Sequence, residues 1–146
     1  MQIEIKIDEN CKEPKIIVVT DKMTEEISEI IKKLAEEQTK TIAGFKEDTV
    51  EVLDPDNILR IHASNSKVFA QTDCNEYLLR LRLYEMEQRL ERYSFVRISN
   101  SEIINLKKVK RFDLSFSGTI CVTLSNGTVT YVSRRYVAKI KKVLGI

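Results

Sequence analysis

The feature that most constrains the fold of this chain is a period-two alternation of apolar and polar residues from about Thr41 to residue 133. Successive side chains of a β-strand point to opposite faces, so this period predicts strands. Turn signals separate them, including "DPDN" at 54–57 and the Asn-Gly pair of "SNG" at 125–127. Ten candidate strands result: 41–45, 49–53, 58–63, 67–72, 76–80, 94–99, 102–106, 109–115, 119–124 and 128–133.

Helical spacing occurs at two places in this β-rich part. Leu83, Met86 and Leu90 recur at intervals of three and four residues, which predicts a short helix over 83–92. The C-terminal stretch "RYVAKIKKVL" puts Tyr136 or Val137, Ile140 and Leu144 on one face and its lysines on the other, which predicts a short basic helix. The fold class expected for residues 46–146 is therefore mainly β with short helices.

Residues 1–45 have a different pattern, which predicts an N-terminal ββα extension. Isoleucines alternate with polar residues over 2–7, and "KIIVVT" at 15–20 is an apolar run typical of a buried strand. An amphipathic helix capped by Thr20 or Asp21 is expected next. Its apolar face consists of Met23, Ile27, Ile30, Ile31 and Leu34.

The apolar face of this helix has to be covered, because two strands and one helix are too small to be stable alone. The extension is expected to pack on its own β domain or on a second copy of the chain. We favour the second copy, and hence a homodimer, because two linked binding modules bind a doubled target far more tightly than one module does. Residues 1–45 contain ten acidic residues and seven lysines, which argues against their contact with a polyanion.

The charge of the chain is unevenly distributed although its net charge is only +2. Residues 97–146 contain ten Lys and Arg but only two acidic residues, Glu102 and Asp113. Such a basic segment indicates a surface that meets a polyanion. The alternatives are a solvated basic face and a surface for an acidic protein partner.

The sequence offers no convincing catalytic or metal site. His62 is the single histidine and lies in an apolar strand, which is typical of a structural role. Cys11, Cys74 and Cys121 are odd in number and widely spaced, which does not suit a zinc site and fits a reducing cytoplasm. No phosphate-binding loop motif occurs. We therefore expect no enzyme activity and neither cofactor nor metal.

Targeting signals are also missing from the sequence. No apolar run approaches the roughly eighteen residues of a membrane span, so membrane insertion is not expected. The start of the chain lacks a positive segment followed by an apolar one, which excludes a signal peptide. The expected location is cytoplasmic.

Three stretches carry a resemblance to a known family. The first is "FVRISNSEIINL", with the pattern Phe-x-Arg-x-x-x-Ser-x-x-x-Asn. The second is "LSNGTVTYVSRRY", a hairpin and a strand that ends in Val-Ser-Arg-x-Tyr. The third, upstream, runs from "DPDN" through a strand pair to the short helix. Together they make residues 46–146 resemble the LytTR family of bacterial DNA-binding domains. One departure is Ser99, where many members have histidine.

The resemblance implies a fold of ten mostly antiparallel strands that reads successive major grooves with loops instead of a recognition helix. It also implies the positions that contact DNA. Asn100 matches one of them, although asparagine also suits a turn for structural reasons. Arg135 matches another, in the loop after the 128–133 strand. A third contact, in the loop after the 58–63 strand, falls on Ser66 or Lys67.

Other polar residues near these positions are secondary candidates. Ser133 and Arg134 match the Ser-Arg pair of the family motif, and either orient their loop or touch phosphate. Ser101 offers a hydroxyl and a backbone N–H that suit phosphate. Lys107 and Lys108 either meet phosphates or belong to a solvated face. Arg97 is expected to be structural and paired with an acidic neighbour.

The expected function is sequence-specific binding of duplex DNA by a bacterial transcription regulator that occupies a promoter site. A protein-interaction module whose basic face binds an acidic protein partner is the alternative. The resemblance does not extend to residues 1–45, which remain a separate extension in either case.

Overall fold

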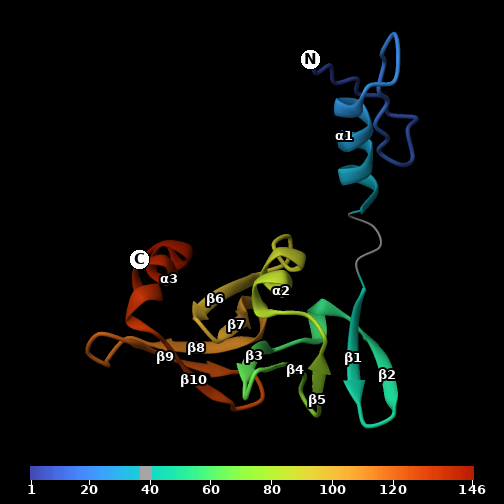
Figure 1. Cartoon of the computed structure of the whole chain (residues 1–146). Coiled ribbons are helices and arrows are strands. Elements are labelled where there is room, and N and C mark those ends of the chain that lie inside the picture. Colours follow the sequence, from blue (N-terminus) through green and yellow to red (C-terminus); the bar gives the residue numbers. More distant parts are fainter. Residues whose placement is uncertain (37–40) are drawn as a thin grey trace. The chain divides into compact units, whose positions relative to one another are not determined.

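The alternating pattern produces ten strands in the computed structural model, which describes residues 1–36 and 41–146 (Figure 1). Each lies within two residues of its predicted bounds. The strands are β1 (Ile42–Lys46), β2 (Thr49–Leu53), β3 (Arg60–Ser64), β4 (Lys67–Gln71), β5 (Glu76–Leu79), β6 (Phe95–Ser99), β7 (Glu102–Asn105), β8 (Val109–Asp113), β9 (Ile120–Leu124) and β10 (Val129–Val132). Contacts divide the chain into two units, Met1–Thr39 and Lys40–Ile146.

All strand pairs of the second unit are antiparallel and form two sheets. The larger sheet has the order β2-β1-β5-β4-β3-β7-β6, and the smaller one has the order β10-β9-β8. Most neighbours are hairpins, whereas β3 pairs with β7 across a long stretch of sequence, with Ile61 opposite Ile103. The mainly β fold class is therefore confirmed. Residues 42–45 form most of β1, so they belong to this sheet although the predicted extension included them.

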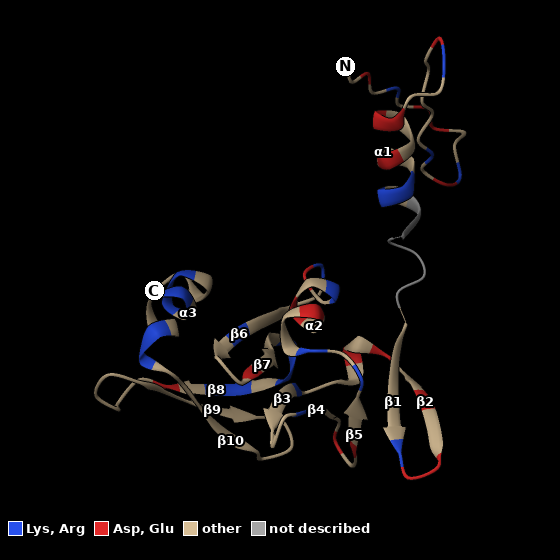
Figure 2. Cartoon of the chain, in the orientation of Figure 1, with Lys and Arg blue, Asp and Glu red and all other residues tan. Residues whose placement is uncertain are grey.

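Two hydrophobic cores lie on opposite sides of the larger sheet. Helix α2 (Leu83–Arg89) covers the first core, where its Met86 packs with Ile61 and Ile103. Helix α3 (Arg134–Leu144) contributes Ile140 to the second core, which Ile104 and residues of the smaller sheet complete. Neighbouring residues of β7 thus face different cores, and both predicted helices are confirmed. Lys and Arg residues recur along α3 (Figure 2).

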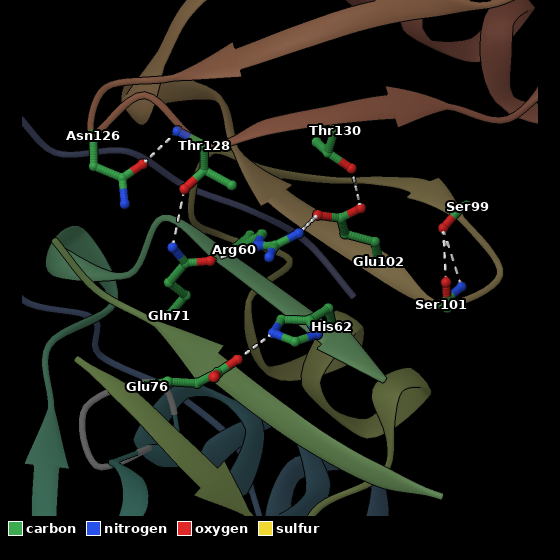
Figure 3. Close-up of polar contacts among 10 residues, drawn as sticks. All are labelled: Arg60, His62, Gln71, Glu76, Ser99, Ser101, Glu102, Asn126, Thr128 and Thr130. Atoms are coloured by element: carbon green, nitrogen blue, oxygen red, sulfur yellow. Dashed lines mark hydrogen bonds and ion pairs between the residues drawn. The ribbon is translucent and has the colours of Figure 1, made fainter. Parts of the chain in front are cut away.

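A polar network connects the two sheets at Glu102, the first residue of β7 (Figure 3). Glu102 is only 7% exposed, and its Oε1 lies 2.7 Å from Nη1 of Arg60. The hydroxyl of Thr130, on β10, donates to Oε2 of the same carboxylate. Arg60 also donates to Gln71 at 2.6 Å, and Gln71 donates to Thr128 at 3.1 Å. Because its charge is paired and its oxygens accept hydrogen bonds, Glu102 can be buried without an orphaned charge.

The N-terminal unit corrects one part of the sequence-based expectation. Helix α1 (Glu25–Glu36) forms as predicted, but Thr24 caps it by accepting a hydrogen bond from the Ile27 N–H at 3.4 Å. Thr20 and Asp21, the predicted caps, and Met23, a predicted member of the apolar face, all lie before the helix. Residues 1–24 form no strand, so the strands predicted over 2–7 and 15–20 are wrong. Alternation marks a face that could be buried, but a strand also needs a partner for its backbone groups, and residues 1–36 supply none.

Replacing Glu102 with alanine is expected to lower the free energy of unfolding by about 1.5–3 kcal/mol, because the Arg60 guanidinium and the Thr130 hydroxyl lose their acceptor. Urea unfolding followed by circular dichroism measures the change. The exposed acid Glu91, replaced by alanine, is the control and should shift stability by less than about 0.5 kcal/mol. Equal stability of the two variants would show that the network does not hold the sheets together.

Candidate nucleic-acid interface

Three segments that are distant in sequence meet at one end of the larger sheet. The β3–β4 turn adjoins the β6–β7 turn, because the Ala63 N–H donates to the Ser101 carbonyl at 2.8 Å. The end of β10 adjoins β6, because the Ser133 N–H donates to the Ile98 carbonyl at 2.9 Å. We call residues 64–67, 99–101 and 133–136 the three-segment surface.

The β3–β4 turn supplies the first segment. Asn65 and Ser66 have φ angles of 51° and 65°, the left-handed pair expected of a two-residue hairpin turn. Ser66 is exposed within the turn, and Lys67 is exposed at the first position of β4. Both candidates for the third family contact therefore lie at the surface of the same turn.

The β6–β7 turn supplies the second segment and is stabilised by hydrogen bonds from Arg97. Nε of Arg97 donates to the Ser99 carbonyl at 2.8 Å, and Nη2 donates to the Asn100 carbonyl at 2.5 Å. Nη1 of Arg97 lies 3.4 Å from the Glu87 carboxylate on α2, so the expected acidic neighbour exists. Ser99 accepts a hydrogen bond from the Ser101 N–H at 3.1 Å. The serine at position 99 therefore stabilises the turn.

The third segment differs from the expectation in one respect. Arg134 and Arg135 lie in the first turn of α3 instead of a loop, because the helix begins directly after Ser133. Ser133 has an extended backbone, and its carbonyl accepts a hydrogen bond from the Tyr136 N–H at 2.9 Å. The Arg134 side chain lies over Gly118, where an added Cβ would be 3.3 Å from its Nε. Arg135 is exposed at the surface.

Lys107 and Lys108 do not join this surface. They lie in the short 3-10 helix η2 (Leu106–Lys108), at the opposite end of β7 from Ser101. Lys107 has its Nζ 4.0 Å from Asp56, and the Lys108 carbonyl accepts a hydrogen bond from the Ser125 N–H at 2.8 Å. Since a strand rises about 3.3 Å per residue, β7 separates the two groups by roughly 13 Å.

The two acidic residues of the basic C-terminal part are engaged within the fold. Glu102 is paired with Arg60. Asp113 accepts hydrogen bonds from the Ser115 hydroxyl at 2.6 Å and its backbone N–H at 2.9 Å, and these bonds lower the pKa of the Asp113 carboxyl. The positive charges of α3 and β8 consequently remain in excess at the surface (Figure 2).

Tyr136 is a site residue that the sequence did not single out. It belongs to α3, yet its hydroxyl donates to Oδ1 of Asn100 at 3.2 Å. The Val-Ser-Arg-x-Tyr motif contains this tyrosine, so the motif marked the position without revealing its partner.

The remaining polar candidates have structural partners. His62 lies 2.5 Å from the Glu76 carboxylate (Figure 3). Its ring also stacks on Phe69. Among the described residues, no group of three or more His, Cys, Asp or Glu side chains could hold a metal ion. No helix within residues 1–36 and 41–146 combines the length and apolar character needed to cross a membrane.

Comparison with known proteins agrees with this geometry. The chain is 31% identical over 147 residues to a Staphylococcus aureus N315 protein named an uncharacterized HTH-type transcriptional regulator, with 100% of this chain and 99% of the relative aligned. The corresponding protein of strain MRSA252 is 30% identical with the same coverage. A LytTr DNA-binding domain from Bacillus cereus has the same fold, with a TM-score of 0.70 and 21% identity over 74% of this chain and 99% of that domain.

The family assignment rests on the greater part of the chain. The family model described as the LytTr DNA-binding domain matches residues 48–145. This range contains the strands β2 to β10, both helices of the second unit and the whole three-segment surface. The chain therefore belongs to the LytTR family of DNA-binding domains.

Proposed function

We propose that this protein is a transcription regulator that binds duplex DNA sequence-specifically, with the three-segment surface entering the major groove. The observation that carries the proposal is the convergence of two hairpin turns and the start of α3, which brings Asn100 and Arg135 to the same end of the sheet as Ser66 and Lys67. Turns held by a rigid sheet can place side chains against base edges without a recognition helix.

The chemistry of the exposed groups suits a base edge and its flanking phosphates. The guanidinium of Arg135 can donate two parallel hydrogen bonds to guanine, and the amide of Asn100 can pair with adenine. Ser66, Lys67 and Arg134 offer donors for phosphate oxygens around them. Although the relatives' names include the term HTH, every two successive helices in the described part of this chain have at least two strands between them. This order of elements argues against a helix-turn-helix as the DNA-reading element.

The N-terminal unit is proposed to join two copies of the chain. Ile3, Ile5, Ile7 and Val19 are 83–91% exposed, and Ile31 and Leu34 of α1 are also exposed. Apolar residues in this number mark an interaction surface. The aligned relatives match over this extension as well. A second copy of the same unit is the proposed occupant, and the acidic character of the extension keeps it away from DNA.

The proposed boundaries follow from these roles. Residues 1–45 include the dimerising unit, and residues 46–146 hold the DNA-binding surface, with β1 as an added strand of its sheet. Binding to chromosomal DNA would place the protein in the bacterial cytoplasm.

Arg135→Ala is expected to weaken binding to the preferred site by about 1–3 kcal/mol and to relax the preference at one or two base pairs, because a bidentate contact to a base is lost. Asn100→Ala should have the same effect at a different base pair. Selection of bound sequences from a random duplex pool, followed by titration of the selected site, measures both effects.

Lys46→Ala is the matched control for these variants, because it removes a positive charge near Asn75, at the other end of β4 from the three-segment surface. If the Arg135 and Asn100 variants bind the selected site as the control does, base reading by this surface is refuted. If the parent prefers an acidic protein to any duplex, the interaction-module alternative replaces the proposal.

The double variant Lys107→Gln and Lys108→Gln tests whether the other end of β7 contacts DNA phosphates. Binding to the selected site and to random duplex should weaken alike, and the slope of log K against log salt should flatten by about one to two units, because phosphate contacts release counterions. Titrations at several salt concentrations measure the slope. An unchanged slope would assign these lysines to a solvated face and confine the DNA footprint to the three-segment surface.

Ile31→Glu combined with Leu34→Glu is expected to convert a dimer to a monomer, because charged side chains would then lie in the proposed contact. These two positions are exposed within their own unit, whereas Ile27 and Ile30 are half-buried. Sedimentation measures the mass, and binding to a two-part site should fall far more than binding to a half-site. Lys32→Glu with Lys33→Glu is the control for added acidity. A monomeric parent at tens of micromolar would contradict the proposal.

A further inference from the structure

Asn100 is held at two points by residues from different elements. The Tyr136 hydroxyl, at the start of α3, donates to Oδ1 of its side chain at 3.2 Å. The Arg97 guanidinium, on β6, donates to its backbone carbonyl at 2.5 Å and to the Ser99 carbonyl at 2.8 Å. Side chain and backbone of the proposed adenine reader are therefore fixed before DNA arrives.

The Tyr136 hydrogen bond determines which way the Asn100 amide faces. A carbonyl oxygen has two lone pairs, and the hydroxyl uses one of them. Within residues 1–36 and 41–146, no hydrogen bond engages the second lone pair or either Nδ2 hydrogen. In the major groove an adenine presents one donor and one acceptor. An amide of fixed orientation can therefore pair with this edge in only one relative orientation. An amide that rotates freely would lose this preference and would also have to be immobilised on binding.

Arg97 plays a different part from the exposed arginines. Its side chain is 16% exposed, and its third contact is Glu87 on α2. The guanidinium therefore has its donors directed at the turn and at α2. A hydrogen bond between the hydroxyls of Ser99 and Ser101, with their oxygens 3.3 Å apart, also stabilises the turn.

We propose that Tyr136 and Arg97 are positioning residues for base specificity, which hold the amide and the backbone of Asn100 in the orientation that selects one base. This inference rests on the proposed function, since it concerns the same surface. It adds that specificity at one base pair depends on a hydroxyl in α3 that does not itself touch the base.

Tyr136→Phe tests the inference most directly, because it removes the hydroxyl and keeps the ring. On the site selected by the parent protein, we expect the preference for the cognate base at the Asn100 position to fall about three- to tenfold, as loss of one hydrogen bond predicts. Affinity for random duplex and the melting temperature should stay at the parental values. In an Asn100→Ala background, Tyr136→Phe should change the base preference no further, because the group that it orients is gone.

Tyr131→Phe is the matched control. Tyr131 is an exposed tyrosine of β10 whose ring packs edge-on against Phe116. Its substitution should leave the base preference intact. If Tyr136→Phe behaves like this control while Asn100→Ala loses the preference, the positioning role is overturned and the proposed function stands. If Asn100→Ala also keeps the preference, or the parent selects no site, the proposed function fails and the inference fails with it.

A measurement without DNA tests whether the contact between Arg97 and the Asn100 carbonyl orders this turn. The side-chain amide protons of Asn100 should give one sharp, shifted pair of resonances in the parent protein. Arg97→Lys, which keeps the charge but loses the fork geometry, should broaden this pair and lower affinity for the selected site about tenfold, while random duplex binds as before. An unchanged amide pair with unchanged specific affinity would show that Arg97 only pairs with Glu87.

Discussion

The rest of the DNA-binding unit depends on the position of β7. This strand is buried at all four of its residues and pairs with β3 on one side and β6 on the other. Ile103 faces the core beneath α2, whereas Ile104 faces the core between the sheets. Its first residue, Glu102, connects the larger sheet to β10 through Arg60 and Thr130. One short strand thereby holds together two cores and two sheets.

The place of β7 also explains where the candidate site lies. The Asn100–Ser101 turn leads directly into Glu102, whose paired and buried carboxylate anchors the turn from the protein side. From the other side, Arg97 and Tyr136 bring β6 and α3 against the same turn. A loop that carries function is thus supported by rigid elements, which is the usual condition for precise recognition. Because Glu102 is paired with Arg60 inside the fold, it does not neutralise the basic side chains of α3. These side chains can therefore attract a polyanion.

The N-terminal unit follows a different principle. Its backbone has one helix, α1, in the described residues and a long segment without helix or strand, and many of its isoleucines and valines are exposed. Burial of apolar surface drives folding and association alike, so a unit that buries little within one chain gains most from a partner. DNA recognition and assembly would then reside in separate units.

The sequence by itself determined the local structure of this protein. Alternation and turn chemistry placed all ten strands, and helical spacing of apolar residues placed both helices of the second unit, because these periods and turn residues are local properties. The same reasoning failed for residues 2–7 and 15–20, where strand formation needed a partner that the pattern could not supply. The family motif marked Asn100 and Arg135 as candidates and implied a loop for Arg135, whereas the structure follows the helical spacing that begins at this residue.

Only the tertiary structure decided which residues work together. Tyr136 and Asn100 are 36 positions apart in the sequence, yet the pairing of β10 with β9 and the packing of α3 against β6 bring them within a hydrogen bond. Lys107 is close to Ser101 in sequence but lies at the other end of β7. A strand separates near neighbours by its length, while sheet packing unites distant turns, and neither effect is visible in a linear pattern.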